Sequence, residues 1–97
     1  MNMQKLLKQA EEMQERMQRD LADTVVEASV GGGIVTVRMD GHKHLLSVKI
    51  DPEAMDPEDP EMLEDLVLAA VNEAVRRTDD AVRSKVGAFA GQMPNLF

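Results

Sequence analysis

The stretch "ASVGGGIVTVRMDGHKHLLSVKID", residues 28–51, sets three consecutive glycines before two runs of alternating apolar and polar residues. Glycine-rich loops hold phosphates where they open onto a helix, but here β-branched residues follow and no Gly-Lys-Ser/Thr sequence comes after them. We therefore interpret Gly31–Gly33 as a hairpin turn and Asp40–Gly41 as the start of a second one. The predicted strands of the resulting antiparallel meander are residues 24–30, 34–39 and 45–50.

One face of this meander is expected to be apolar, because side chains alternate between the two sides of a strand. The residues predicted to share that face, subject to register, are Val26, Ala28, Val30, Val35, Val37, Met39, Leu46, Val48 and Ile50. Three strands also leave two open edges. Each edge needs a covering element or a partner.

Apolar residues recur at three- and four-residue spacing on both sides of the meander, which predicts two long amphipathic helices and an α+β fold. The first helix is expected from about Asn2 to Ala22, and the second from Pro60 to about Val86, with Gly87 as its stop. Asp-Pro-Glu at residues 59–61 is typical of a helix start. The second apolar stripe is wide enough for the sheet and a second copy of the chain.

Composition limits the class of protein. Ninety-seven residues make one small domain, and the absence of cysteine excludes disulfides and thiol chemistry. Charged residues interrupt every apolar run, so we expect no signal peptide or membrane span and a soluble, cytoplasmic protein. His42 and His44 have no third ligand at a defined spacing, and no nucleophile stands in a recognisable context. The sequence therefore predicts no metal site, no cofactor and no enzyme.

The net charge of −7 is unevenly distributed along the chain. Residues 1–21 are neutral, with four basic and four acidic side chains. A stretch without any basic residue holds six acids: Asp51, Glu53, Asp56, Glu58, Asp59 and Glu61. The whole-chain charge weakens any expectation of strong non-specific nucleic-acid binding, yet it leaves room for a local basic surface.

Four cations lie on the first predicted helix, opposite its apolar stripe and within ~80° of one another at ~100° per residue. They are Lys5, Lys8, Arg16 and Arg19. Such a face is either a solvated surface with weak ion pairs or a rod that presents cations to a polyanion. On the second helix, four-residue spacing predicts ion pairs of Glu73 with Arg77 and of Asp79 with Arg83.

Several motifs together resemble the YbaB/EbfC family of bacterial nucleoid-associated proteins. They are Gly31-x-Gly33-x-Val35-x-Val37 followed by Gly41, "VKIDPE" at residues 48–53, "EMLEDLVLAAVNEAVRR" at residues 61–77, and "LLKQAEEMQERMQ" at residues 6–18. The similarity covers nearly the whole chain, and residues 1–90 are taken as the family-like domain. Residues 91–97 are expected to be a flexible tail, and their ending "MPNLF" departs from the family pattern.

This resemblance implies a homodimer with protruding helices that binds duplex DNA in the nucleoid, with a role in nucleoid organisation or gene regulation. It also implies a link to recombination or replication proteins as partners. The DNA-contact residues carried over by position are Lys5, Lys8, Arg16, Arg19, Arg76 and Arg77, with Arg83 and Lys85 ranked below them. The alternative interpretation is an acidic protein-interaction module of the replication or recombination machinery, in which DNA association is secondary.

Overall fold

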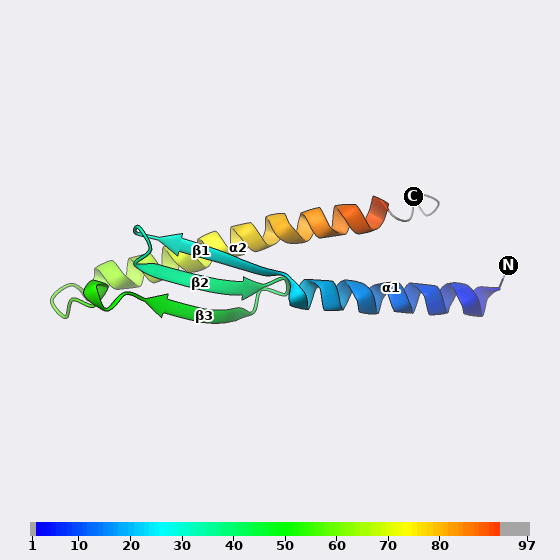
Figure 1. Ribbon diagram of the computed structural model, residues 1–97, viewed down its shortest axis with the longest axis horizontal. Coiled ribbons are helices and arrows are strands. Elements are labelled where there is room, and N and C mark those ends of the chain that lie inside the picture. The colour runs from blue at the N-terminus through cyan, green and yellow to red at the C-terminus, as the bar shows by residue number, and fades with distance from the viewer. Residues whose placement is uncertain (1, 92–97) are drawn as a thin grey trace.

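The chain forms two long helices joined by a three-stranded sheet (Figure 1). The computed structural model describes residues 2–91, so Met1 and residues 92–97, which hold most of the predicted tail, lie outside it. In chain order the elements are α1 (Met3–Asp23), β1 (Val25–Val30), β2 (Val35–Asp40), β3 (Leu45–Ile50), a 3-10 turn (Pro52–Ala54) and α2 (Pro60–Gly91). The molecule is elongated, at 69 × 18 × 15 Å, and its order of elements confirms the predicted α+β fold.

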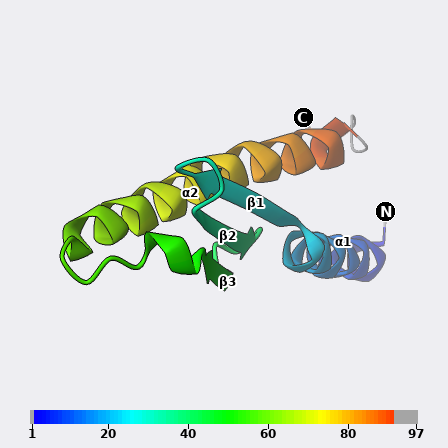
Figure 2. The same cartoon turned by 60° about the vertical axis from the view of Figure 1, so that its left-hand side comes forward.

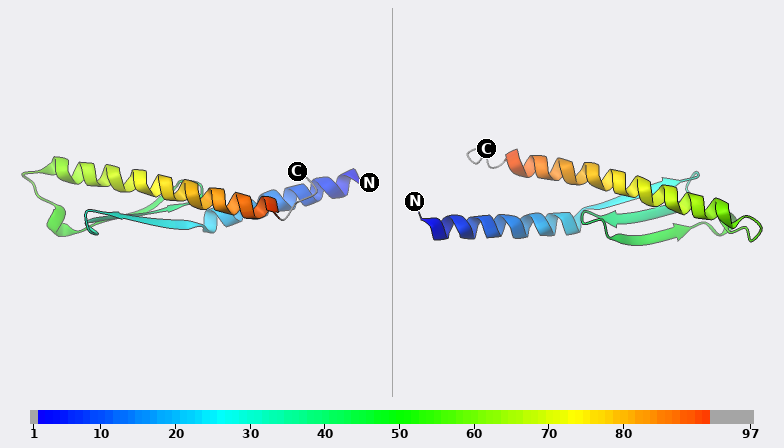
Figure 3. Two further views of the ribbon diagram at one scale, coloured as in Figure 1. Left: turned by 90° about the horizontal axis from the view of Figure 1, so that it is seen from above. Right: turned by 180° about the vertical axis from the view of Figure 1, so that it is seen from behind.

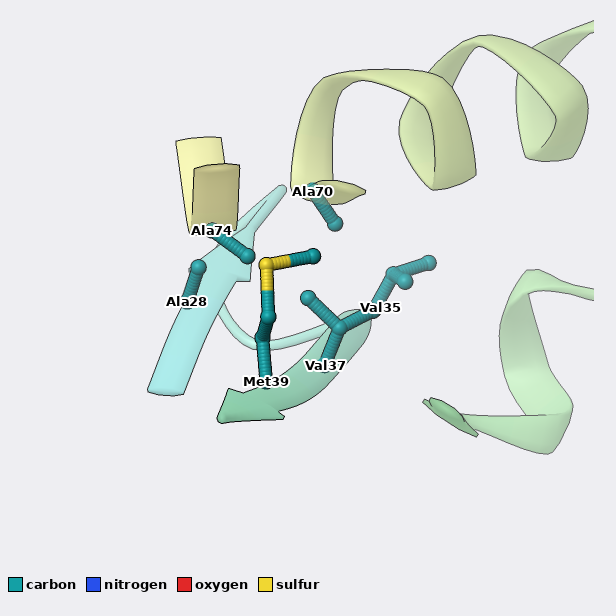
Figure 4. Packing of buried hydrophobic residues seen from close by; sticks show 6 residues of the cluster. All are labelled: Ala28, Val35, Val37, Met39, Ala70 and Ala74. Carbon is teal, nitrogen blue, oxygen red and sulfur yellow. The ribbon is translucent and has the colours of Figure 1, made fainter. Parts of the chain in front are cut away.

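The core lies between α2 and the first two strands (Figure 2). Its buried apolar residues are Ala28, Val35, Val37, Met39, Ala70 and Ala74 (Figure 4). The antiparallel register sets Ala28 opposite Val37, so the apolar face predicted for β1 and β2 is confirmed. Ala70 and Ala74 face this sheet from α2, and their small side chains let the helix lie close to the strands.

The apolar residues of β3 are less covered than those of its neighbours. Val48 pairs with Val37 but is 44% exposed, because α2 lies mainly over β1 and β2. The register also shifts by one residue between Arg38 and Met39, which places Leu45 rather than Leu46 opposite Met39. β3 therefore continues the predicted apolar face, but its part of that face is largely uncovered by the helices within residues 2–91.

The run Gly31–Gly33 forms the turn between β1 and β2, as predicted. All three glycines have positive φ angles, of 62°, 71° and 96°. A side chain is strained in that region of backbone space, so the turn requires glycine for its conformation. No ligand role is needed to explain these residues.

The predicted end of the second helix is wrong. α2 continues through Gly87 to Gly91, and Gly87 is not among the residues with positive φ. A glycine in an exposed helix weakens it by about 1 kcal/mol relative to alanine but does not end it unless the chain turns into the left-handed region. The predicted start is confirmed, because the Asp59 Oδ1 accepts a hydrogen bond from the Met62 N–H at 3.3 Å.

α1 extends beyond the sheet and has no buried residue (Figure 3). Asn2 caps it, since the Asn2 Oδ1 accepts a hydrogen bond from the Lys5 N–H at 3.3 Å. Leu6 and Leu7 of its apolar stripe are 42% and 60% exposed. The apolar stripe of α1 is therefore uncovered along most of the helix within residues 2–91.

Candidate nucleic-acid interface

Four of the eleven basic side chains have a carboxylate oxygen within 4 Å among residues 2–91, and seven have none. Four of these seven lie on α1, and all four are exposed: Lys5, Lys8, Arg16 and Arg19. The ion pairs that one interpretation of this face expected are therefore not formed on α1 within residues 2–91. The helix presents four hydrated cations along its length.

A small set of contacts at the C-terminal turn of α1 fixes the helix to the sheet. The Gly41 N–H donates to the Leu21 carbonyl oxygen at 2.9 Å, and the Thr24 hydroxyl donates to the Asp20 carbonyl oxygen at 2.6 Å. The His42 Nε2 lies 3.3 Å from the Gln18 carbonyl oxygen. These contacts set the direction in which the cations of α1 project.

Gly41 is required by a close approach. A Cβ atom at this position would lie 2.4 Å from the Leu21 carbonyl oxygen, a backbone atom that cannot move aside alone. The positive φ of the β2–β3 turn belongs instead to Lys43, at 65°. The sequence identified Asp40–Gly41 as a hairpin but did not indicate the second role of the glycine, which is to let the C-terminal turn of α1 pack closely on the β2–β3 turn. We call this contact between Gly41 and Leu21 the seat of α1.

Asp40 organises the turn beside this seat. Its Oδ1 accepts hydrogen bonds from the backbone N–H groups of His42 and His44, both at 2.9 Å. The bond from the His44 N–H is the main cause that lowers the pKa of Asp40 below its ordinary value. A carboxylate therefore holds the loop in shape at the base of α1.

The arginines of α2 have acidic partners. The Arg76 Nε donates to the Glu73 Oε2 at 3.1 Å, and its Nη1 donates to the Asp80 Oδ2 at 3.2 Å. The Arg77 Nε donates to the Glu73 Oε1 at 3.0 Å, which confirms the predicted pair, and its Nη1 donates to the Glu27 carbonyl oxygen at 2.9 Å. Carboxylates therefore already offset the charge of both guanidiniums, which weakens the attraction that either one exerts on a phosphate.

The remaining predicted pair is wrong. Arg83 binds Asp80, three residues earlier, at 3.2 Å, whereas Asp79 binds Lys43 of the β2–β3 turn at 2.6 Å. Asp79 thus pairs with Lys43 of another element instead of with Arg83 on its own helix. No signal in the local sequence distinguishes these two arrangements.

The two arginines lower the pKa of Glu73 to about 2, and the hydrogen bond from Arg76 is the largest cause. Because the carboxylate stays ionised in the folded state, its stabilising effect is present above the ordinary value of 4.5 and is lost as the pH falls toward 2. We expect Glu73→Gln to flatten the dependence of the melting temperature on pH between pH 5 and pH 2. Thermal unfolding followed by circular dichroism checks this, and an unaltered pH profile would contradict it.

No metal site is apparent in the part of the chain that the structure describes. No group of three potential metal ligands gathers within residues 2–91. Asp51, Asp56 and Asp59 each accept a hydrogen bond from a backbone N–H within three residues, so all three carboxylates cap local backbone groups. No helix in residues 2–91 is both long and apolar enough to cross a bilayer.

An apolar groove of about 890 Å³ lies between the end of β3, the loop that follows the 3-10 turn and the first half of α2. The apolar residues that line it include Ile50, Met55, Leu63, Val67, Leu68 and Val71. Leu68 is 61% exposed and Met55 is also 61% exposed. We call this surface the β3–α2 groove. Part of the broad apolar stripe predicted for the second helix lines this groove.

Comparison with known proteins assigns the chain to a family. The YbaB/EbfC DNA-binding family matches residues 1–93. The chain belongs to this family. Its membership confirms the resemblance drawn from the glycine and helix motifs and the prediction of a non-enzymatic DNA-binding protein.

Relatives at substantial identity cover nearly the whole chain. A nucleoid-associated protein of Acidobacterium capsulatum is 51% identical over 104 residues, covering 98% of this chain and 95% of its own. One from Koribacter versatilis is 49% identical over 92 residues, covering 95% of this chain and 91% of its own. The crystal structure of the uncharacterized protein HP0035 from Helicobacter pylori has the same fold, with a TM-score of 0.66 at 22% identity and coverage of 84% and 94%.

Proposed function

We propose that this YbaB/EbfC protein binds duplex DNA as a homodimer, mainly through phosphate contacts, and organises the nucleoid or regulates genes there. The observation that carries the proposal is the set of four unpaired cations on the exposed α1 helix, within residues 2–91. Phosphate contacts supply most non-specific affinity for DNA, and cations without carboxylate partners form them at the lowest desolvation cost. The names of the relatives, which are nucleoid-associated proteins, support the location.

The α1 residues Lys5, Lys8, Arg16 and Arg19 are the principal contacts in this proposal. Arg76 and Arg77 contribute less, because Glu73 binds both guanidiniums. A phosphate there meets guanidiniums whose charge the carboxylates already offset. No helix-turn-helix arrangement is present within residues 2–91, which favours recognition of backbone and shape over base edges.

Fluorescence anisotropy of a labelled duplex, titrated with the protein across a salt series, tests this proposal. Saturable binding that weakens steeply with salt is expected, and the slope of the logarithm of the binding constant measures the phosphates engaged. Absence of binding at low salt would overturn the proposed function. Light scattering on the same samples gives the assembly state.

The proposed dimer joins two copies along β3 and the β3–α2 groove. β3 is an edge strand of the sheet, and its side chains Leu45, Leu46 and Val48 are 44%, 52% and 44% exposed. The groove continues this apolar surface onto α2, so one two-fold contact covers both features. The small domain would thereby bury more apolar surface than its own core does.

Leu68→Glu is expected to convert the dimer to a monomer, since it places a charge at the centre of the proposed contact. Because Leu68 is 61% exposed, the fold of each chain should be retained. Size-exclusion chromatography with light scattering measures the mass, and circular dichroism checks the fold. A variant that remains a dimer would place the interface elsewhere.

The acidic protein-interaction module remains the alternative. Three of its six acids already cap local backbone groups, which gives them a structural role independent of any partner. A protein partner that no longer binds after Asp56, Glu58 and Asp59 are neutralised, together with no retardation of DNA by the unmodified protein, would favour it. The described contacts favour the DNA-binding dimer.

A further inference from the structure

The sheet has one face covered by α2 and one face turned away from it (Figure 3). Val35, Val37 and Met39 of β2 point into the core, so the alternating residues Thr36 and Arg38 point to the other side. The register extends this surface to the neighbouring strands. We call it the open face: Glu27, Ser29, Thr36, Arg38, Ser47 and Lys49.

Two unpaired cations stand on the open face. Arg38 and Lys49 are exposed, and no carboxylate oxygen lies within 4 Å of either among residues 2–91. Lys49 is paired in register with Thr36, and Arg38 with Ser47, so the two cations are diagonal neighbours on adjacent strands. Diagonal neighbours on adjacent strands lie about 7–8 Å apart. The long side chains of Arg38 and Lys49 can therefore contact phosphates of the same DNA strand.

Hydroxyl groups surround these cations. The Ser29 Oγ and the Thr36 Oγ1 lie 2.6 Å apart across β1 and β2, and Ser47 is opposite Arg38. Serine and threonine hydroxyls donate to phosphate oxygens in protein–DNA complexes as arginine and lysine do. The open face thus combines charged and neutral donors, and none of its six residues is aromatic and able to stack on a base.

We propose that the open face is a second surface for the phosphate backbone of duplex DNA, with Arg38 and Lys49 as its charged contacts. This inference rests on the proposed function and extends it from α1 to the sheet. Lys49 lies on the edge strand β3, so a dimer joined along β3 brings the Lys49 side chains of both copies to the middle of one continuous face. Glu27, opposite Arg38, is the one acid among the six residues of this face and opposes the contact.

The test compares Arg38→Gln/Lys49→Gln with the unmodified protein in the anisotropy titration across salt. The double variant is expected to bind duplex DNA about tenfold more weakly at low salt, and its salt slope should fall by about 0.9 for each phosphate that is no longer neutralised. Lys43→Gln, compared with the single variant Lys49→Gln, is the charge-matched control, because Lys43 lies in the β2–β3 turn and already has a carboxylate partner. The control should keep the slope of the unmodified protein.

Glu27→Gln supplies a change of opposite sign on the same surface. It is expected to tighten binding about threefold, since it removes repulsion between the carboxylate and DNA. If these residues had only a structural role, removing the cations and removing the acid would not change DNA affinity in opposite directions. Circular dichroism and light scattering verify that all variants keep their fold and mass.

The outcomes separate this inference from the function on which it rests. Binding by Arg38→Gln/Lys49→Gln equal to that of the unmodified protein overturns the open-face contact and leaves the α1 interface standing. An equal weakening in the charge-matched control, or tighter binding of a single strand than of the duplex, also overturns it. If the unmodified protein binds no DNA at low salt, the proposed function itself has failed.

Discussion

Reversing three charges on α1, with Lys5→Glu, Lys8→Glu and Arg16→Glu, is expected to weaken duplex binding by about 100-fold or more at low salt, because each reversal removes a phosphate contact and adds a repulsive charge. These effects accumulate along one face of the helix. All three side chains are exposed and no residue of α1 is buried, so the fold should not change. Because phosphate contacts carry no base information, the weakening should be similar for unrelated sequences.

Anisotropy titrations on two duplexes of different sequence measure this effect. Glu12→Gln/Glu15→Gln is a matched control on the same helix, and it should tighten binding by removing two acids from among the cations. The mass in solution should be the same in all variants. Undiminished binding after charge reversal would remove α1 from the interface and contradict the central part of the proposal.

Replacing Gly41 by alanine is expected to cause the largest decrease in stability of any single-methyl change in the described chain. The added Cβ would lie 2.4 Å from the Leu21 carbonyl oxygen, where the Gly41 N–H now donates at 2.9 Å. Overpacking of this kind costs about 1–3 kcal/mol, and in a domain of this size each 1 kcal/mol lowers the melting temperature by about 4–8 °C. The seat of α1 must shift, so DNA binding should weaken as well.

Gly87→Ala is the matched control, because it adds the same methyl group with nothing within 4 Å of it. In the middle of an exposed helix turn, alanine is favoured over glycine by about 1 kcal/mol, so this variant should melt at a higher temperature. Thermal unfolding of both variants measures the two effects. A Gly41→Ala variant as stable as the unmodified protein would show that the contact with Leu21 does not constrain α1.

The elements of this fold follow from local patterns. Alternating residues in the stretch 34–39 indicate a strand, and the three- and four-residue spacing in residues 3–21 indicates a helix, because each periodicity places apolar side chains on one side. Local chemistry also located the start of α2, where Asp59 caps the backbone. The end of α2 was predicted wrongly, since a glycine at residue 87 is compatible with both a stop and a continued helix.

The candidate site was predicted less completely than the fold. The helical wheel placed Lys5 and Arg16 on one exposed face, but only the structure shows that no carboxylate pairs with them within residues 2–91. The preference of Asp79 for Lys43 depends on a turn 36 residues away in sequence, which no helical spacing encodes. Arg38 and Lys49 were not singled out, although strand alternation already places both opposite the core.

By itself, the sequence determined the identity and order of the helices and strands, the turn at Gly31–Gly33 and the YbaB/EbfC resemblance, because these depend on neighbouring residues. Tertiary structure decided which surfaces remain uncovered. α2 lies over β1 and β2 and leaves Val48 exposed, and Gly41 seats α1 so that it projects away from the sheet. These features arise from contacts between distant segments, whose geometry no local pattern specifies.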